Sequence, residues 1–439
     1  MSNAFDFPPD FVWGTATSAY QIEGATDVNG RGESIWDRFC TVPGAIADGS
    51  DGRIACDHYH RYREDVDLIA TLGFNAYRFS IAWPRVIPNG TGPVNAKGLD
   101  FYDRLVDALL EKDIAPYATL YHWDLPQTLE DQGGWRNRDT AHAFADYTHA
   151  TVARLGDRVT SWATLNEPYC AAVLGHQTGE HAPGMRFLKA TFAAAHHLLL
   201  AHGLAIPVIR DQAPQADAGI VLNFTPAYPA SDSDADKKAT AIKDGFDNRW
   251  YVEPIAGTGY PEDTVNAMGW DQAEIQPDDL NAIAAPVDFL GVNYYTRQVI
   301  SAEGPVEPTL PVTDMGWEIH PDGLYDTLRT LHTHRRFTKL YITENGAAMP
   351  DTADDTDRVD DQDRIDYLER HLESLLRARR DGVPVEGYFG WSLLDNFEWA
   401  LGYAKRFGLV RVNFDTLART PKASALWLRD AVRAGRASR

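Results

Sequence analysis

Short apolar, β-prone runs alternate along this chain with longer stretches whose apolar residues recur at helical spacing. We interpret the short runs as strands and the longer stretches as helices. The predicted strands cover residues 12–16, 76–81, 115–120, 159–165, 218–223, 288–292, 339–343 and 387–391. The predicted helices cover residues 61–72, 95–112, 139–155, 188–210, 235–250, 277–284, 323–334, 364–381 and 423–432.

The order of these elements predicts an α/β protein with eight strand–helix units. The alternation favours a single closed (β/α)8 TIM barrel, in which helices surround buried parallel strands and the loops after the strands build the functional site. A chain of 439 residues exceeds the usual length of one domain, but α/β barrels often do so as one unit. We therefore expect one domain over residues 1–439. Long loops at 35–57, 225–236 and 299–317 are expected to form the walls of a pocket.

Composition and charge restrict the partners. The formal net charge of −22 opposes a nucleic-acid partner, because phosphate binding needs a basic surface. The three cysteines, Cys40, Cys56 and Cys170, are scattered without metal-ligand spacing, which argues against a disulfide framework and for a reducing compartment. No apolar run approaches the roughly 20 residues of a membrane helix, and residues 1–10 lack a signal region. We expect a cytoplasmic protein with no membrane partner, and the sequence makes no prediction of its oligomeric state.

Two glutamates follow predicted strands in unusual surroundings. Glu167 lies in the segment TLNEP and Glu344 in the segment YITENG, so each is placed where a buried strand ends. In a parallel barrel, chemistry takes place at these ends. One such Glu alone is more often an ordinary loop carboxylate or a charge at a helix N-terminus. A pair suits glycosidic bond cleavage, where one carboxyl group protonates the leaving oxygen and the other attacks or supports the anomeric carbon.

Longer motifs surround both glutamates along the whole chain. They are FVWGTATSAYQIEG at 11–24, YRFSIAWPR at 77–85 and WSLLDNFEW at 391–399, together with TLNEP and YITENG. In this order they resemble glycoside hydrolase family 1, the retaining β-glucosidases and β-galactosidases. The resemblance implies that Glu167 is the acid/base and Glu344 the nucleophile of a double displacement through a covalent glycosyl-enzyme. This scheme implies retention of configuration and carboxyl groups about 5 to 5.5 Å apart.

The resemblance also implies a set of sugar-binding residues. Sugars need hydrogen-bonding groups for their hydroxyls and aromatic rings for their C–H faces. Taken singly, a histidine or tryptophan here is more often part of the core. The substrate-binding residues expected are Gln21, His122, Asn166, Tyr295, Trp317, Trp391, Glu398, Trp399 and Phe407, and a cis peptide bond is expected between Trp391 and Ser392. Further possible lining residues of the aglycone side are Cys170, Leu174 and His181, each of which is equally consistent with loop packing.

The nucleophile is expected to have its own supporting residues. By the same resemblance these are Arg78, Asn293 and Tyr295. A guanidinium and a phenol beside Glu344 are expected to hold it ionised and to lower its pKa, whereas burial and the charge of Glu344 are expected to keep Glu167 protonated before the first step. We expect neither a metal ion nor an organic cofactor, because the chain shows no dinucleotide, Walker or zinc motif.

Glu398 bears on the substrate. In the family, enzymes that act on 6-phosphoglycosides generally replace this carboxylate, and an anion here is expected to repel a phosphate. We therefore expect a retaining β-glucosidase that releases terminal β-D-glucosyl residues from small oligosaccharides or aryl glucosides, with a place in cellulose degradation. The alternatives are a β-galactosidase, β-fucosidase or 6-phospho-β-glucosidase of the same family. A catalytically silent sugar-binding protein is a further alternative, from a different class.

Overall fold

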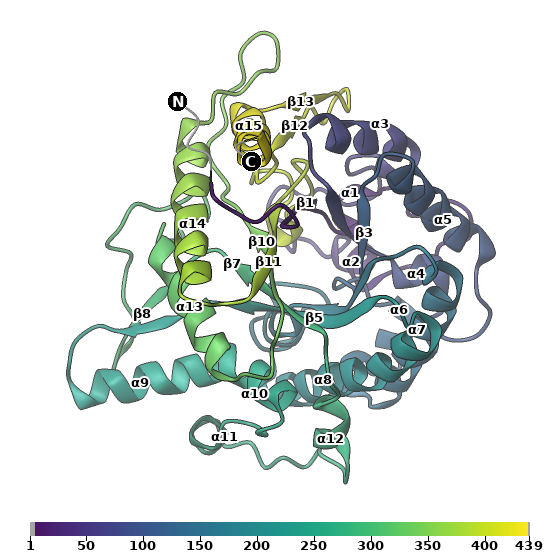
Figure 1. Ribbon diagram of the computed structural model, residues 1–439. Coiled ribbons are helices and arrows are strands. Elements are labelled where there is room, and N and C mark those ends of the chain that lie inside the picture. The colour runs from purple at the N-terminus through teal and green to yellow at the C-terminus, as the bar shows by residue number, and fades with distance from the viewer. Residues whose placement is uncertain (1–4, 438–439) are drawn as a thin grey trace.

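The strands of the protein close into a barrel (Figure 1). The computed structural model describes residues 5–437, and within them eight parallel strands pair in the order β1-β11-β10-β7-β5-β4-β3-β2. This confirms the predicted (β/α)8 barrel. The barrel strands are β1 (Val12–Ala16), β2 (Ala76–Ser80), β3 (Ala115–Tyr121), β4 (Ser161–Asn166), β5 (Asp217–Phe224), β7 (Phe289–Tyr294), β10 (Leu340–Asn345) and β11 (Val385–Trp391).

Helices surround the strands, as Figure 1 shows for α3, α5, α7 and α8 on one side and α13 and α14 on the other. The longer helices are α3 (His58–Thr71), α5 (Ala96–Leu110), α7 (Asp139–Leu155), α8 (Leu188–Gln212), α9 (Asp234–Asp244), α13 (Pro321–Thr333), α14 (Gln362–Arg380) and α15 (Ala423–Ala437). The shorter ones are α1 (Ala19–Ile22), α2 (Ile35–Phe39), α4 (Trp83–Val86), α6 (Gln127–Glu130), α10 (Trp250–Ala256), α11 (Glu262–Met268) and α12 (Asp279–Ile283). 3-10 turns lie at Gly134–Arg136 and Trp399–Leu401, and π-helical segments at Cys170–Thr178 and Gly245–Arg249.

Helix α8 differs from the sequence expectation about apolar segments. By length and composition it is apolar enough to cross a membrane, although most of its apolar window is buried inside the molecule. It packs against α7, β4 and β5. Its apolar character is thus explained by contacts on several sides within the core.

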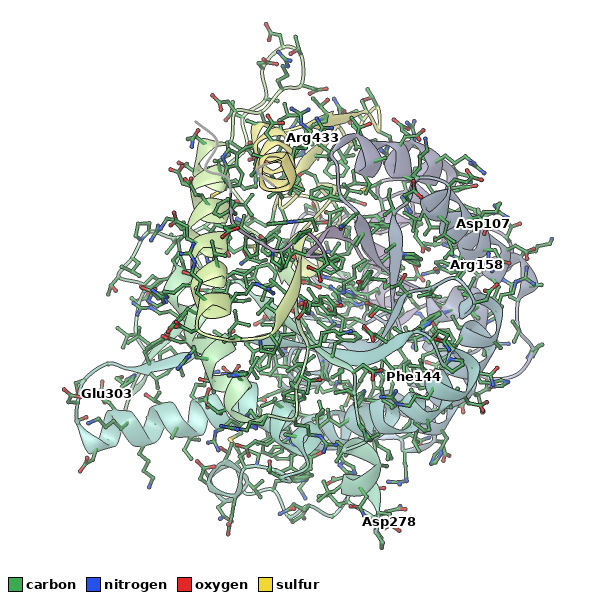
Figure 2. The ribbon with its side chains drawn as sticks, viewed as in Figure 1. Asp107, Phe144, Arg158, Asp278, Glu303 and Arg433 are labelled. Atoms are coloured by element: carbon green, nitrogen blue, oxygen red, sulfur yellow. The ribbon has the colours of Figure 1, made fainter. Side chains whose placement is uncertain are left out.

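The three predicted loops are more ordered than expected. The first contains α2, and the other two contain strands β6 (Ala227–Pro229), β8 (Gln298–Ser301) and β9 (Gly304–Pro305), which form a small separate sheet. Figure 2 shows Glu303 at the tip of the β8–β9 hairpin, next to α9 and away from the barrel. Strand β6 pairs with β8 across about seventy residues of sequence, so local patterning carried no signal of it.

Aromatic side chains fill the inside of the barrel. Tyr117, Phe289, Tyr341 and Phe389 are buried there, and their ring centroids lie 5.0 Å apart for Tyr117–Phe389 and 5.5 Å for Phe289–Tyr341. A side chain on Gly14 of β1 would lie 2.3 Å from the Phe389 ring, so this glycine makes room for the layer. The inside of the barrel is therefore a packed core, and it lies below the carboxyl ends of the strands.

A buried charge network joins the C-terminal helix to the loop after β11. Lys422, just before α15, contacts Asp395 in that loop at 2.7 Å and also pairs with Asp351. Arg364 of α14 contacts Asp351 at 3.0 Å, and these side chains are almost completely inaccessible to solvent. Ion pairs at the surface are less enclosed: Arg158, three residues after the end of α7, and Asp107 of α5, both labelled in Figure 2, lie 2.7 Å apart. The buried network therefore holds the segment that carries Glu398 and Trp399.

We predict that Lys422→Met lowers the free energy of unfolding by about 3–5 kcal/mol, because it leaves the Asp395 and Asp351 carboxylates buried without their ammonium partner. The matched control is Lys112→Met, which removes an exposed pair with Asp67 and is expected to cost less than about 1 kcal/mol. Denaturant unfolding followed by tryptophan fluorescence measures both. Equal midpoints for the two variants would contradict the prediction.

Candidate active site

One cavity of about 650 Å³ opens at the carboxyl ends of the barrel strands. Both glutamates face it, although each side chain is largely buried, at 5 % exposed for Glu167 and 3 % for Glu344. The structure places most of the predicted site residues in its lining, namely His122, Glu167, Asn293, Tyr295, Trp317, Glu344, Trp391, Glu398, Trp399 and Phe407, together with Cys170, Leu174 and His181. Gln21, Arg78 and Asn166 are buried without lining the cavity.

Glu344 is the second-last residue of strand β10, and each of its two carboxylate oxygens accepts a hydrogen bond from a side chain. Arg78 of β2 donates through Nη1 to Oε1 at 2.7 Å, and the Tyr295 hydroxyl donates to Oε2 at 2.6 Å. Both contacts favour the ionised carboxylate. The expected lowering of its pKa is nevertheless not the net result: burial raises the pKa of Glu344, and Arg78 and Tyr295 act against this rise. Desolvation of a fully enclosed carboxyl outweighs one cation and one phenol.

Glu167 follows strand β4 and has only uncharged donors. Asn293 of β7 donates through Nδ2 to Oε1 at 2.7 Å, and the Cys170 thiol donates to Oε2 at 3.2 Å. Burial, followed by the charge of Glu344, raises the pKa of Glu167 to about 8. The single proton of this pair therefore resides on Glu167 near neutral pH, while Glu344, beside Arg78, holds the charge.

A chain of amides sets the protonation of His122. Asn166 accepts at Oδ1 from Arg78 Nη2 at 2.6 Å and from Asn293 Nδ2 at 3.1 Å. Since two donors occupy this oxygen, the Asn166 amide nitrogen must face His122 Nε2, which lies 3.1 Å away. Nε2 is then the acceptor and Nδ1 carries the proton. Nδ1 is buried without a hydrogen-bond partner at the cavity wall.

Glu398 is a third buried carboxyl at the cavity. Its Oε2 has no hydrogen-bond partner, and burial, together with the charges of Glu344 and Glu167, raises its pKa to about 8. Gln21 lies behind it: Gln21 Nε2 donates to Asn396 Oδ1 and to the Phe397 carbonyl, both at 2.9 Å. His122 Nδ1–H is thus a free donor and Glu398 Oε2 a free oxygen at the cavity. Hydroxyl groups of a bound molecule can accept from the first and hydrogen-bond to the second.

Aromatic rings form the remaining walls. Trp391 stacks with His122 at a centroid distance of 5.8 Å, and its peptide bond to Ser392 is cis. Trp399 packs against Trp123 at 4.6 Å. Tyr295, also in the lining, lies with its ring centroid 5.5 Å from that of Trp317 and 5.9 Å from that of Phe407. Aromatic rings and unpartnered polar atoms in one lining match the two kinds of contact that a sugar makes.

The comparisons with known proteins agree with this geometry. The model of the family described as "Glycosyl hydrolase family 1" matches residues 3–436. The chain belongs to glycosyl hydrolase family 1. It is 47% identical to beta-glucosidase A of Acetivibrio thermocellus, over 97% of this chain and 98% of that protein.

Two solved structures are close to this family 1 chain in three dimensions. The AHE enzyme from Alicyclobacillus herbarius has a TM-score of 0.96 and 49% identity over 99% of both chains. The family 1 β-glucosidase from Thermotoga maritima in complex with isofagomine lactam has a TM-score of 0.95 and 45% identity, covering 98% of this chain and 99% of that one.

Sequence reasoning missed part of the lining of this family 1 cavity. Trp123, next to His122, lines it, and its place two residues after the end of β3 was an available signal. Lys243 and Asp247 also line it but come from the helical segment after β5, whose sequence carries no local sign of a pocket. Among residues 5–437, no group of three or more His, Cys, Asp and Glu side chains is arranged to hold a metal ion.

Three lining residues have a left-handed backbone conformation. They are Trp123, with φ of 77°, Glu167, with φ of 47°, and Trp399, with φ of 50°. Each such residue costs of order 1–3 kcal/mol and persists only where its surroundings determine it. The packing of the loops after β3, β4 and β11 therefore holds these three residues in an unfavourable backbone conformation. In this conformation their side chains line the cavity.

We predict that His122 is neutral and protonated on Nδ1, because Asn166 occupies Nε2 and burial holds the pKa of His122 well below its usual range. ¹⁵N NMR of labelled histidine should show this tautomer with no titration between about pH 5 and pH 8. The resonance is assigned by its loss in His122→Gln. Asn166→Asp presents an acceptor to Nε2 and should move the proton to that nitrogen. A wild-type Nε2–H signal would contradict the assignment.

Proposed function

We propose that this chain is a retaining β-glucosidase that releases terminal β-D-glucosyl residues from small oligosaccharides or aryl glucosides. One observation carries the proposal. Two buried carboxyl groups face one cavity with opposite partners, a guanidinium and a phenol on Glu344 and uncharged donors on Glu167. This difference separates an ionised nucleophile from a protonated acid. The names of the family 1 relatives support the same activity.

In the first step Glu344 is the nucleophile. Its ionised carboxylate attacks the anomeric carbon from one face of the sugar, and the bond from that carbon to the leaving oxygen breaks. Glu167 gives its proton to the leaving oxygen, so that the aglycone departs as a neutral alcohol. Arg78 and Tyr295 hold the attacking carboxylate in place. The products of this step are the free aglycone and a glycosyl ester of Glu344.

In the second step Glu167 is the base. Once Glu344 is esterified its charge is gone, and the repulsion that raised the pKa of Glu167 disappears. Glu167 then takes a proton from water while the water oxygen attacks the anomeric carbon and the ester bond to Glu344 breaks. Two displacements at the same carbon return the original configuration.

We place the glucosyl unit of the substrate against Glu398, His122 and Trp391 in the lining of the cavity. Glu398 and His122 present the unpartnered polar atoms that its hydroxyls need, and Trp391 presents a ring face. Tyr295, Trp317, Trp399 and Phe407 enclose it, while Gln21 and Asn166 orient the groups that touch it. A galactoside or fucoside uses the same contacts except at the 4- and 6-positions, so these sugars are the alternative glycones.

A silent sugar-binding protein is the alternative from another class. Such a protein has no need for two carboxyl groups with opposed partners, and burying them without function is costly. We further propose a cytoplasmic enzyme that acts on soluble products of cellulose breakdown. The three unpaired cysteines are consistent with a reducing compartment.

We predict opposite azide products from two variants. Glu344→Gly should lower hydrolysis of a β-glucoside roughly a thousandfold or more, and azide in the vacated space should restore turnover and give the α-glucosyl azide in one displacement. Glu167→Ala should still react with a dinitrophenyl glucoside, whose leaving group needs little protonation, and azide should give the β-glucosyl azide through two displacements. NMR of the products assigns the anomers. The same azide anomer from both variants would contradict the assignment of Glu344 as nucleophile and Glu167 as acid/base. A fully active Glu344→Gly variant would show that Glu344 is not the nucleophile.

We predict that the unmodified glucoside is preferred to its 6-phosphate. Glu398 lines the cavity, and neither its protonated nor its ionised form supplies the positive charge that a buried phosphate needs. We therefore expect kcat/KM for the phosphorylated substrate to be lower by about a hundredfold or more. Nitrophenyl glucoside and its 6-phosphate, assayed side by side, measure the ratio. In Glu398→Gln, the ratio of kcat/KM for the unmodified glucoside to kcat/KM for the 6-phosphate should be smaller than in the wild-type enzyme. Equal rates in the wild-type enzyme would favour the 6-phosphoglycosidase alternative.

A further inference from the structure

Cys170 contacts the oxygen of Glu167 that Asn293 leaves free. It begins the π-helical segment Cys170–Thr178, one turn after Glu167, and its backbone N–H donates to the Glu167 carbonyl at 3.0 Å. Its Sγ lies 3.2 Å from Glu167 Oε2, and the residue lines the cavity. The other two cysteines have different partners: Cys56 donates to the Asp395 carbonyl, and Cys40 contacts the Tyr20 hydroxyl.

We propose that Cys170 is a positioning residue for the acid/base carboxyl group, and that its thiol selects Oε2 of Glu167 as the oxygen that gives and takes the proton. The proposal deepens the proposed function and rests on it. It concerns a hydrogen bond to a reacting carboxyl group, and the thiol itself forms no bond with the substrate.

The two oxygens of Glu167 have unlike partners. Oε1 faces an amide nitrogen, and the orientation of that amide is settled because Asn293 Oδ1 accepts from the Thr343 hydroxyl at 2.7 Å. An amide N–H can only donate, so Oε1 remains an acceptor in both protonation states. A thiol can donate or accept. Oε2 is therefore the oxygen that can carry a proton without facing a second donor.

The thiol serves both states of Glu167. In the ionised state its S–H donates to Oε2 and favours the base that the second step needs. In the protonated state the S–H turns away, and Oε2–H gives its proton to the leaving oxygen. Burial and the neighbouring carboxylates raise the pKa of Cys170, so the thiol keeps its own proton throughout. It consequently neither replaces Glu167 nor attacks the sugar.

Other charged groups also act on this carboxyl. Glu344 on β10 raises the pKa of Glu167, and Arg78 on β2 lowers it. Tyr295 after β7 and Glu398 after β11 also interact with Glu167 electrostatically, and Asp247 of the segment Gly245–Arg249 interacts with the thiol. These groups stay in place when only the thiol is changed. The effect of a Cys170 substitution on the titration of Glu167 therefore reports the S–H···O contact.

The test compares Cys170→Ala and Cys170→Ser with the matched control Cys40→Ala. The acid form of Glu167 is lost as pH rises through a pKa of about 8, which gives the alkaline limb of kcat/KM. Removing a donor to the ionised form should move this limb upward by about half a pH unit in Cys170→Ala. Cys170→Ser retains a donor and should leave the limb at or below its wild-type position. Cys40→Ala should not move it.

A second readout separates this proposal from the proposed function. The Glu167 carboxyl is titrated directly by ¹³C NMR of protein labelled at the glutamate side chain, with assignment by loss of the signal in Glu167→Gln and with no substrate present. The same upward shift in Cys170→Ala supports the thiol contact. If the wild-type protein hydrolyses no β-glucoside, the proposed function fails and this titration still decides the contact.

Two results would overturn the proposal. One is a titration midpoint of Glu167 that is unchanged in Cys170→Ala. The other comes from a double variant: in a Glu167→Ala background, adding Cys170→Ala should not alter the residual turnover of a dinitrophenyl glucoside. Suppose that Cys170→Ala lowers the turnover of the dinitrophenyl glucoside by the same factor with and without the Glu167 carboxyl group. The thiol then acts through packing and not through that carboxyl group.

Discussion

The ion pair between Arg78 and Glu344 is the interaction on which the chemistry of this protein depends. Three carboxyl groups, those of Glu167, Glu344 and Glu398, are buried at one cavity and repel one another. Among the described residues, Arg78 is the cation that hydrogen-bonds to this group, and it does so at Glu344 alone. Burial raises the pKa of all three groups, and the placement of one guanidinium favours the charged form at Glu344.

The barrel makes such an arrangement stable. Arg78, Asn166, Asn293 and Glu344 come from four strands, and their side chains meet because parallel strands of a closed barrel end at the same rim. The aromatic layer fills the barrel below them, and the buried ion pair of Lys422 with Asp395 ties the loop after β11 to the segment before α15. Burying several carboxyl groups together costs free energy, and the stability of the rest of the fold offsets this cost. Such local cost is typical of functional sites.

Much of the fold was open to prediction from the sequence. All eight barrel strands were expected within a few residues of their positions, because each is a short apolar run bounded by turn residues. Glu167 and Glu344 were expected at strand ends for the same local reason. The small sheet of β6, β8 and β9 was not expected, since β6 pairs with β8 across a long stretch of sequence. Helix α2 was not expected either, although its capping box of Ser34 and Asp37 is a local signal.

The sequence by itself determined the strand–helix alternation, the two glutamates and the neighbours that the family motifs contain. Only the tertiary structure decided the electrostatics. Burial raises the pKa of Glu344 where its partners alone suggested a fall. Asn293, which acts against this rise, also donates hydrogen bonds to Glu167 and Asn166. The contact between Cys170 and Glu167 Oε2, and the left-handed backbone conformation of Glu167, are likewise known only from the folded structure. Desolvation and the direction of each hydrogen bond arise only when distant segments enclose the site. They therefore cannot be read from residue types or from their spacing along the chain.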